Sequence, residues 1–437
     1  MNVIPSVAIH TLGCKVNQCD SESLLARLAE AGYSIYEFNK DADVYIINTC
    51  TVTHAGDKKS LQMIRRARRQ NASAFVAVCG CMPRGQTDSV NKIMAAGADF
   101  VFDTRKPDDL LAKLSETFQT ANPTAPSDIN YVNERTRAFI KIQDGCDRYC
   151  AYCIVPYVRG PVTSRLPGDI LAEAEAHTQR GVQEIVLTGI QVAAYGYDTD
   201  SGKLTLPGLV KRLVTPELKR LRLSSIDPWA IDDAFLEVVA HSPTLCSHFH
   251  LSLQSGSDRT LARMNRRYNT ADYSKAAEKL RALRPNMGLT TDIIVGFPGE
   301  SDSDFAESLR FVEHMGFSRI HVFEYSPRAG TPAADFPDQV PSHVKTARGQ
   351  EMRALAQDLE QCFLYAQVGT VAPVLFESQV RDLSLEANQT SEVWQGNTEN
   401  YCMVRVQGAG LANSIKDIRI TNATDNGLVG NLKASQK

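Results

Sequence analysis

Cys146, Cys150 and Cys153 are spaced in a way that suits an iron-sulfur cluster. Cysteine thiolates hold such clusters in proteins, and four of them saturate a four-iron cluster. Three thiolates leave one iron open to bind a small molecule. The spacing therefore predicts a cluster that takes part in a reaction rather than one that only transfers electrons.

A zinc site is the alternative for these cysteines, because zinc motifs also begin with close pairs such as Cys150 and Cys153. Zinc sites normally add a second pair of ligands. No Cys-x-x-Cys or His-x-x-x-His pair lies in the stretch that follows, and the nearest later cysteine is Cys246. We therefore favour the cluster.

The composition places these cysteines in a protein of several domains. The chain has 437 residues, of which 43% are hydrophobic and 22% charged, enough for two or three hydrophobic cores. It has eleven cysteines, no export signal and no stretch long enough to span a membrane, which indicates reduced thiols and metal ligands. We expect a cytoplasmic, oxygen-sensitive protein.

A second set of three cysteines follows predicted strands near the start of the chain. Apolar runs at 7–12, 44–48, 75–78 and 100–103 alternate with helical stretches such as 21–30 and 57–69, the pattern of a parallel α/β sheet. Cys14, Cys50 and Cys81 come just after the first three runs. Loops after parallel strands share one edge of the sheet, so we expect these cysteines to meet.

Simple packing is the alternative for this second set, since cysteines fit well behind strands. Cys19 and Cys79 compete for membership of the set. We choose Cys81 over Cys79, because Cys79 falls within or at the end of its strand and Cys81 lies beyond the turn at Gly80.

The middle of the chain predicts an open barrel. After a Pro-rich, polar stretch at 120–128, strands are expected at 138–142, 184–187, 220–224, 248–253, 289–295 and 319–325. Helical stretches separate them, including 169–180, 232–240, 258–264, 270–283 and 303–315. Six consecutive strand-helix units indicate a partial (β/α)6 barrel.

Barrels of this kind carry their active sites in the loops after the strands, where this sequence has its polar clusters. The candidates for binding a cofactor are Thr188, Gly189, Gln191, Ser225, Asp227, Gln254 and Gly296. Arg328, after the last strand, has a fixed charge that suits a carboxylate of a cofactor or substrate. The alternative for each of these residues is a turn or capping role.

From about residue 365 the pattern changes to short β-type runs, at 368–376, 390–394, 401–406 and 415–421. About 70 residues of this kind suit a small β-barrel that binds RNA or only closes the fold. We therefore expect an α/β protein with a three-layer domain at 1–120, a linker at 121–135, the partial barrel at 136–364 and the small β-barrel at 365–437.

Two groups of basic residues could contact RNA phosphates. One helix carries Arg65, Arg66 and Arg69 together with Lys58, Lys59 and Arg68, and a second stretch carries Arg259, Arg263, Arg266 and Arg267. The net charge of −3 does not itself indicate a nucleic-acid binder. A solvated helix face is the alternative for both groups.

The chain has a three-cysteine motif in its predicted barrel, and a three-cysteine α/β domain precedes that barrel. With these features it resembles the radical S-adenosylmethionine (SAM) methylthiotransferases across nearly its full length. The resemblance implies that the motif cysteines bind a [4Fe-4S] cluster whose open iron chelates SAM, which is then cleaved to a deoxyadenosyl radical. It implies a second [4Fe-4S] cluster, carrying the sulfur, on Cys14, Cys50 and Cys81. It also implies that Tyr152 contacts the adenine of SAM, and the last domain resembles the TRAM RNA-binding domain more weakly.

Within the family, residues 10–18 and 48–60 look most like the tRNA enzymes that act on N6-threonylcarbamoyladenosine at position 37. This implies methylthiolation of C2 of that adenine. From their charges, Arg328 and the helix of Arg65, Arg66 and Arg69 are our candidates for binding the substrate. A radical route suits the reaction, because an aromatic C–H bond is too strong and nonacidic for proton removal. The chain departs from the family in two respects. Cys19 and Cys79 are additional thiols, and Asp227 stands where a longer acidic residue is usual.

Two other functions stay open, namely methylthiolation of a ribosomal-protein aspartate and RNA binding without turnover. The open iron argues against the second, because a purely structural cluster gains nothing from it. The resemblance also implies an electron donor such as flavodoxin or ferredoxin. The lack of a stretch long enough to span a membrane predicts no membrane partner. The sulfur donor is not predicted.

Overall fold

The computed structural model describes residues 5–85, 88–118, 136–198, 204–380 and 392–433. They form two compact units. The first contains the described residues of 1–134 with 144–162 and 326–335, and the second contains those of 135–143, 163–325 and 336–437. Within the described residues, no helix is long and apolar enough to cross a membrane. The predicted domain boundaries stay predictions, and the predicted linker at 121–135 lies outside the described residues.

The first unit is built on a parallel sheet of five strands, in the order β2-β1-β3-β4-β5. They are β1 (Ser6–Thr11), β2 (Ser34–Tyr36), β3 (Val44–Thr49), β4 (Phe75–Gly80) and β5 (Phe100–Val101). The central strand β3 is buried along its whole length, as expected for a strand covered on both faces. The α/β prediction for this part of the chain is confirmed.

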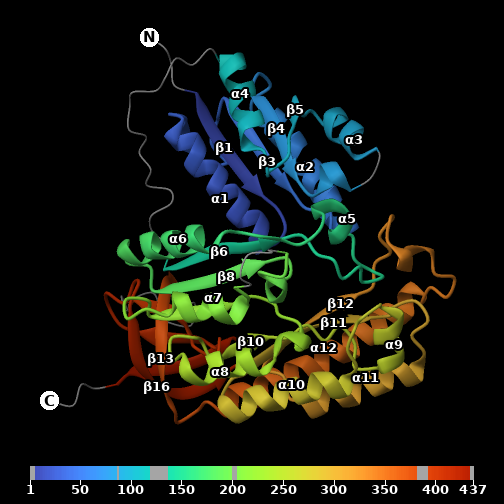
Figure 1. Ribbon diagram of the computed structural model, residues 1–437, viewed down its shortest axis with the longest axis vertical. Coiled ribbons are helices and arrows are strands. Elements are labelled where there is room, and N and C mark those ends of the chain that lie inside the picture. Colours follow the sequence, from blue (N-terminus) through green and yellow to red (C-terminus); the bar gives the residue numbers. More distant parts are fainter. Residues whose placement is uncertain (1–4, 86–87, 119–135, 199–203, 381–391, 434–437) are drawn as a thin grey trace, which may run out of the picture. The chain divides into compact units, whose positions relative to one another are not determined.

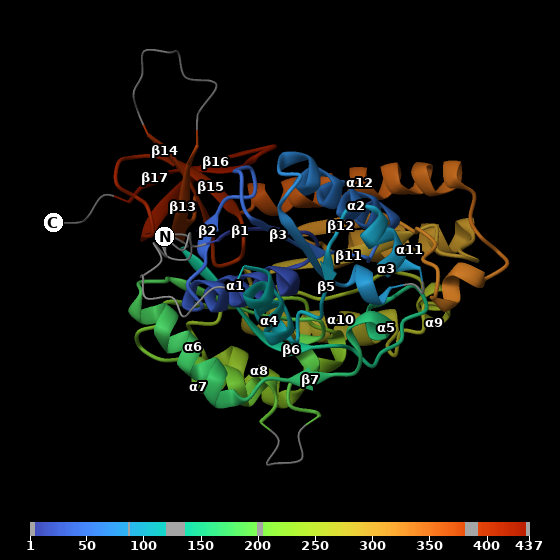
Figure 2. The ribbon, with the colours of Figure 1, turned by 90° about the horizontal axis from the view of Figure 1, so that it is seen from above.

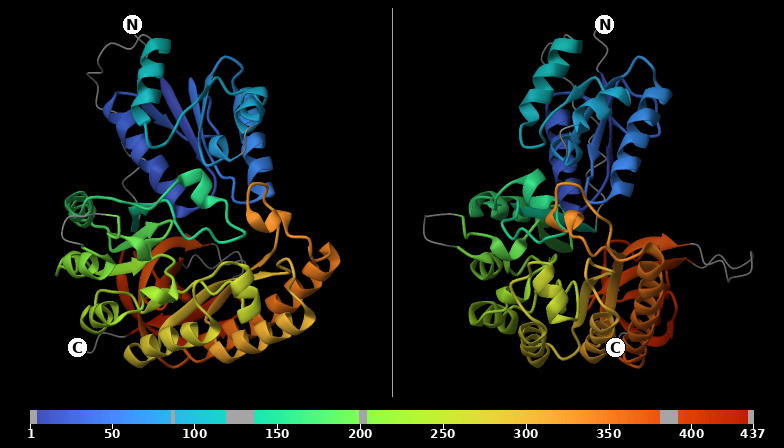
Figure 3. Two further views of the ribbon diagram at one scale, coloured as in Figure 1. Left: turned by 45° about the vertical axis from the view of Figure 1, so that its right-hand side comes forward. Right: turned by 90° about the vertical axis from the view of Figure 1, so that its right-hand side faces the viewer.

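Helices cover both faces of this sheet (Figure 1, Figure 3). They are α1 (Lys15–Glu30), α2 (His54–Gln70), α3 (Ser89–Ala95) and α4 (Pro107–Phe118). Leu28 of α1 and Leu110 of α4 pack in one core cluster, whereas Ile64 of α2 and Ile93 of α3 pack in another. The unit therefore has three layers, and the carboxyl ends of the neighbouring strands β1, β3 and β4 share one edge.

The second unit contains a partial barrel whose six main strands are parallel to their neighbours. They are β6 (Arg137–Asp144), β8 (Glu184–Gly189), β9 (Arg220–Leu223), β10 (His248–His250), β11 (Gly288–Val295) and β12 (Arg319–Glu324), with the short β7 (Thr163–Ser164) beside β6. The helices between them are α6 (Pro167–Gln179), α7 (Leu206–Leu213), α8 (Asp233–His241), α9 (Asp258–Arg263), α10 (Thr270–Leu283) and α11 (Asp302–Met315). One core cluster joins these strands and helices. The predicted partial barrel is confirmed.

The chain continues through α12 (Ser342–Tyr365) into a closed barrel of five strands, in the order β13-β14-β15-β17-β16. Figure 2 shows this barrel in dark red and α12 in orange. The strands are β13 (Val371–Val380), β14 (Val393–Thr398), β15 (Met403–Gln407), β16 (Ile415–Thr424) and β17 (Gly427–Leu432). Alternate side chains such as Val404 and Val406 fill its core. The predicted small β-barrel is confirmed, although β2, β17 and the 24-residue helix α12 were not among the predicted elements.

Glu184, the first residue of β8, is fully buried among arginines. Arg222 donates to its two carboxylate oxygens at 2.8 and 3.0 Å, and nitrogens of Arg137 and Arg220 lie 3.7 and 3.9 Å from that carboxylate. Burial alone would raise the pKa of Glu184, but the charge and hydrogen bonds of Arg222 hold the pKa below its ordinary value of 4.5. The buried carboxylate is therefore kept ionised.

Replacing Glu184 with Gln should lower the free energy of unfolding by about 3–5 kcal/mol at pH 7, because buried arginines lose their counter-charge. Since the folded pKa lies below the ordinary value of 4.5, the carboxylate stabilises the fold above that pH, and its contribution is lost as the pH falls through the folded pKa. Urea unfolding at pH 7 and in steps below pH 4.5 measures the effect. Glu175→Gln, on an exposed face of α6, is the control. A difference from the parent that stays constant at every pH would contradict the prediction.

Candidate functional site

The motif loop, residues 144–162, turns sharply at Gly145. This glycine has a φ of +70°, and a Cβ atom here would lie 1.8 Å from the carbonyl oxygen of Pro161. Only glycine allows so close an approach. The backbone NH of Cys146 then donates to the carbonyl of Gly160 at 3.0 Å, which closes the loop behind the first motif cysteine.

The other two motif cysteines lie in a tight turn. The backbone NH of Cys153 donates to the carbonyl of Cys150 at 2.9 Å, and Tyr152 lies half-buried between them. Cys150 is 7% exposed, whereas Cys146 and Cys153 are partly exposed. The loop therefore presents a set of three thiols of which two reach the surface.

Cys14, Cys50 and Cys81 meet at the carboxyl edge of the sheet in the first unit. The Sγ atoms of Cys14 and Cys81 each lie 3.9 Å from the same oxygen, Oδ1 of Asn17. A Cβ atom at Gly13 would lie 3.0 Å from Sγ of Cys50. The structure thus brings together three cysteines that are far apart in the sequence, at the sheet edge that the strand pattern indicated.

The short helix α5 (Val155–Arg159) links the two cysteine sets. Cys81 packs against Ile154 and Val158 in one small apolar cluster. Arg84, three residues after Cys81, donates to the carbonyl of Val158 at 3.2 Å. Both sets therefore belong to the first unit.

Arg159, at the end of α5, is a site residue that the sequence analysis missed. Its buried guanidinium donates to both carboxylate oxygens of Asp144 at 2.9 Å and lies 3.3 Å from the carboxylate of Asp20. It also donates to Oδ1 of Asn17, the atom that Cys14 and Cys81 approach. A single arginine carries no spacing signal, so only the fold shows that a fixed cation stands beside these thiols.

Burial and a nearby cation act in opposite directions on the second cysteine set. Burial raises the pKa of Cys50 and Cys81. At Cys81 the charge and hydrogen bond of Arg159 offset part of this rise, whereas at Cys50 the charges of Cys14 and Asp57 add to it. Burial alone would lower the pKa of Arg159, but Cys81 and Asp144 raise it, so the cation persists. Metal binding releases the protons of thiol ligands, and three thiols beside a fixed cation therefore fit a cluster.

Across the described residues, no group of three His, Cys, Asp or Glu side chains is arranged to hold a single metal ion. A four-iron cluster differs from a single ion, because each cysteine binds a different iron and the thiolates need not converge on one point.

Cys79 and Cys19 have other surroundings. Cys79 lies inside β4 and packs in the core with Val7 and Ala77, and burial raises its pKa well above the ordinary value. Cys19 is buried within α1. These positions favour Cys81 as the third member of the set.

In the second unit, several predicted cofactor-binding residues form a polar network beyond the strand ends. Gln191 donates through Nε2 to Asp227 at 3.3 Å, and Arg266 pairs with the same carboxylate at 2.6 Å. Ser225 and Ser252 share a hydroxyl hydrogen bond of 2.7 Å. The structure thus joins Gln191 and Asp227 as expected and adds Arg266, which the sequence analysis did not include in this site.

The remaining candidates lie at the same ends of their strands. Thr188 and Gly189 end β8. Gln254 follows β10 with a φ of +71°, and the NH of Gly296 donates to the carboxylate of Glu300 at 2.6 Å. A positive φ at a residue other than glycine is uncommon and marks Gln254 as a constrained position.

Arg328 belongs to the first unit, where it lies beside the loop of Cys50. Its guanidinium donates to Thr51 and pairs with Asp57, and the side chain is 2% exposed. Within the described residues its Nε is buried without a hydrogen-bond partner. One donor of this guanidinium therefore remains for a ligand.

The helix α2 keeps most of its positive charge exposed. Arg65, Arg66 and Arg69 lie on its surface, whereas Arg68 turns inward and pairs with Asp99 at 2.5 Å. This exposed face suits phosphate contact.

The second basic group is largely neutralised by ion pairs. Arg259, Arg263 and Arg266 pair with Asp304, Asp338 and Asp227. The structure therefore favours α2 over this group as a phosphate-binding surface.

Two family models match the chain. Residues 6–103 match the model described as uncharacterized protein family UPF0004, and residues 140–312 match the Radical SAM superfamily. The two matches cover the sheet that carries the second cysteine set and most of the partial barrel.

Two relatives from Bacillus subtilis (strain 168) match most of the chain. It is 36% identical over 433 residues to the threonylcarbamoyladenosine tRNA methylthiotransferase MtaB, covering 96% of this chain and 94% of the relative. It is 33% identical over 415 residues to the tRNA-2-methylthio-N(6)-dimethylallyladenosine synthase, covering 92% and 80%. A solved structure of the radical SAM methyltransferase TsrM from Kitasatospora setae matches with a TM-score of 0.57 and 14% identity over 76% of this chain and 77% of that one, which shows a shared fold.

Proposed function

Because this chain belongs to the radical SAM tRNA methylthiotransferases, we propose that it adds a methylthio group to C2 of N6-threonylcarbamoyladenosine at position 37 of tRNA. Enzymes of this family use SAM and two [4Fe-4S] clusters. Since the relatives act on tRNA by name, a ribosomal-protein substrate and RNA binding without turnover are set aside.

Our choice of nucleoside rests on the comparison of this chain with two enzymes of Bacillus subtilis. The chain is 36% identical to the threonylcarbamoyladenosine enzyme of Bacillus subtilis and 33% identical to the dimethylallyladenosine enzyme, and it covers 94% of the first and 80% of the second. The higher identity and the larger coverage both favour N6-threonylcarbamoyladenosine as the substrate. The runs at 10–18 and 48–60 support the same choice.

In this proposal each cysteine set holds one cluster. Cys146, Cys150 and Cys153 hold the first, and the set around Asn17 and Arg159 holds the second. When bound, the clusters and SAM supply a radical able to attack an aromatic C–H bond and the sulfur that replaces its hydrogen. Arg159 places a positive charge beside the second set of thiols and fixes Asn17 next to them.

The other parts of the proposal follow from this chemistry. Tyr152 contacts the adenine of SAM, and the network of Gln191 and Asp227 binds its polar groups. A low-potential donor such as flavodoxin or ferredoxin supplies electrons. The reaction takes place in the cytoplasm, since the proposed substrate is tRNA.

Arg328 suits recognition of the threonyl carboxylate, a group that a dimethylallyl substituent lacks. Its Nε remains without a partner in the described part of the chain, and the side chain lies beside the loop of Cys50. Guanidinium groups bind carboxylates through short, charge-assisted hydrogen bonds. We therefore propose that Arg328 selects for N6-threonylcarbamoyladenosine.

Arg328→Lys is expected to raise KM for tRNA carrying this nucleoside by about 10-fold, because an ammonium group cannot keep the contacts to Thr51 and Asp57 and also bind the carboxylate. Deoxyadenosine formation without tRNA should stay at the parent level. Arg310→Lys, on an exposed face of α11, is the control. A parent-like KM for Arg328→Lys would remove Arg328 from the substrate site.

Replacing Arg65, Arg66 and Arg69 of α2 with Ala should weaken tRNA binding and reduce the slope of log K against log salt by about 2–3, since each phosphate contact contributes about 0.7–0.9. Binding titrations at several salt concentrations measure the slope. A triple variant of Lys219, Lys275 and Arg310 makes the same charge change at exposed positions of the second unit. Equal slopes in the two triple variants would assign the effect to net charge rather than to α2.

Mass spectrometry of tRNA nucleosides from cells with and without this protein tests the function. Loss of 2-methylthio-N6-threonylcarbamoyladenosine, restored by the parent chain and not by Cys150→Ala, is the expected result. Loss of the 2-methylthio-dimethylallyl nucleoside instead, with the threonylcarbamoyl product unchanged, would overturn the choice of substrate.

A further inference from the structure

The turn between β14 and β15, residues 397–403, lies at the starts of the main strands of the partial barrel. We call it the floor hairpin. The first residues of β6, β9, β10 and β11 contact it. The first residue of β12 lines a cavity with it, and the first residue of β8 is linked to it through Arg222. These contacts lie at the amino ends of the strands, opposite the edge that carries the cofactor-binding candidates.

Tyr401 stands at the centre of the floor hairpin. Its ring stacks on His248 with ring centres 4.8 Å apart, and the guanidinium carbons of Arg222 and Arg137 lie 4.7 and 5.5 Å from its centre. Guanidinium groups are attracted to an aromatic face. The backbone of Tyr401 has a φ of +70°, a conformation that costs free energy in a bulky residue. The packing of the ring therefore holds a strained turn in place.

Two buried arginines bind the backbone of the floor hairpin. Arg220 donates to the carbonyl of Asn397 at 2.9 Å, and Arg222 donates to the carbonyl of Glu399 at 3.0 Å. The other nitrogens of Arg222 bind Glu184 at 2.8 and 3.0 Å. Because buried guanidinium donors are costly without acceptors, moving the hairpin along β9 would cost free energy.

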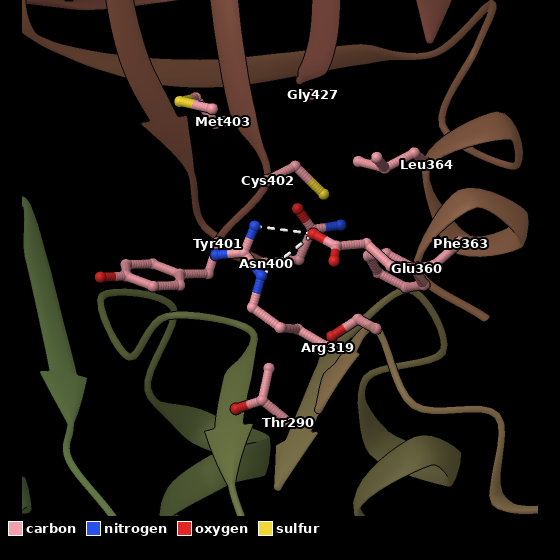
Figure 4. A pocket seen from close by; sticks show the side chains of 11 residues that line it. Thr290, Arg319, Glu360, Phe363, Leu364, Asn400, Tyr401, Cys402, Met403 and Gly427 are labelled. Atoms are coloured by element: carbon pink, nitrogen blue, oxygen red, sulfur yellow. Dashed lines mark hydrogen bonds and ion pairs between the residues drawn. The ribbon is translucent and has the colours of Figure 1, made fainter. Parts of the chain in front are cut away.

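The same hairpin packs closely against β11 and β12. A Cβ atom at Gly288 would lie 2.2 Å from the carbonyl oxygen of Asn400. The side chain of Asn400 donates to the carbonyl of Asn286 at 3.1 Å. Figure 4 shows Asn400 and Tyr401 beside Arg319, which pairs with Glu360 at 2.6 Å. The cavity among these residues is about 20 Å³, room for about one water molecule.

The barrel strands form two separate sheets, β7-β6-β8-β9 and β10-β11-β12. Within the described residues, isolated bridges such as Leu221 with Leu245 and Ile226 with Leu251 join them. Because so few bridges join the two sheets, another element is needed to fix the angle between them. The floor hairpin contacts both halves.

We infer that Tyr401 is a positioning residue for the radical reaction, because the floor hairpin fixes the curvature of the partial barrel. The C-terminal barrel then serves catalysis in addition to any contact with RNA. This inference rests on the radical SAM family and not on the choice of tRNA nucleoside. Groups held at the opposite edge depend on that curvature, and a displacement of about 1 Å can cost about 100-fold in rate.

The test compares Tyr401→Ala and Tyr401→Phe with Tyr365→Ala, a control that removes a tyrosine 60% exposed at the end of α12. In the protein without cofactors, hydrogen–deuterium exchange should become faster at the starts of β6, β9 and β10 in Tyr401→Ala alone. After reconstitution, the same variant should give about 10-fold less methylthiolated product per deoxyadenosine formed, with an unchanged Kd for tRNA. Tyr401→Phe should match the parent, since the ring supplies the stacking.

Parent-like exchange and parent-like product yield in Tyr401→Ala would overturn the inference, and so would a loss of tRNA affinity that accounts for the whole loss of product. If Tyr401→Ala does not fold, Tyr401→Leu, which keeps bulk but removes the aromatic face, is judged by the same outcomes. The methylthiolated product is measured on whichever tRNA nucleoside the protein modifies. An error in the proposed substrate would therefore not change the comparison between Tyr401→Ala and the parent.

Discussion

Cys150→Ala is expected to form no 5′-deoxyadenosine above background, a fall of at least about 100-fold. Loss of an outer contact of a metal ligand already costs about 10- to 100-fold in metal affinity or activity, and here one of three proposed ligands is removed. Cys150 is 7% exposed in a turn held by backbone hydrogen bonds, and the smaller alanine fits the same space. The fold should therefore survive while the first cluster is lost.

Anaerobic reconstitution followed by iron analysis checks this directly. Iron per chain should fall by about half, from about eight to about four atoms. Cys362→Ala, at an exposed position of α12, should keep the full iron content. Full iron and normal deoxyadenosine formation in Cys150→Ala would remove this residue from the cluster site.

Cys81→Ala is expected to separate the two halves of the reaction. SAM cleavage should continue, while methylthiolated product should fall by at least about 100-fold, because the second cluster loses a ligand. The basis is the position of Cys81, whose Sγ lies 3.9 Å from Oδ1 of Asn17, as does Sγ of Cys14. Deoxyadenosine and modified nucleoside are measured in the same reaction.

Cys79→Ala is the matched control, since it removes the same atom two residues away. Cys79 lies inside β4 in the apolar core, so both clusters and both activities should persist. Loss of product in Cys79→Ala together with its retention in Cys81→Ala would exchange their roles.

Sequence spacing located the first three thiols because they lie within eight residues of one loop. The meeting of Cys14, Cys50 and Cys81 was also predictable, since parallel strands place their following loops at one edge. The main strands of the barrel were predictable from short apolar runs between helical stretches. In each case the information is local or follows from a rule of topology.

Other features depend on contacts that no local pattern reports. Arg159 acts on the cysteine set from another part of the chain through Asn17 and Asp20. The strand β17 contains two glycines and an asparagine, which are poor strand residues, and forms because β15 and β16 pair with it. Few residues of α12 are buried, so its apolar stripe is weak.

The floor hairpin also sets an order of events while the chain is being made. Its bonds from Arg220 to Asn397 and from Arg222 to Glu399 each join residues 177 positions apart. At roughly 5–20 residues per second, roughly 9–35 s pass between the synthesis of each arginine and that of its carbonyl acceptor. In a nascent or prematurely ended chain that stops before residue 397, these buried guanidinium groups therefore lack these carbonyl acceptors, although Glu184 is present. Such a chain, with an unfinished barrel, is expected to be a preferred target of chaperones and proteases.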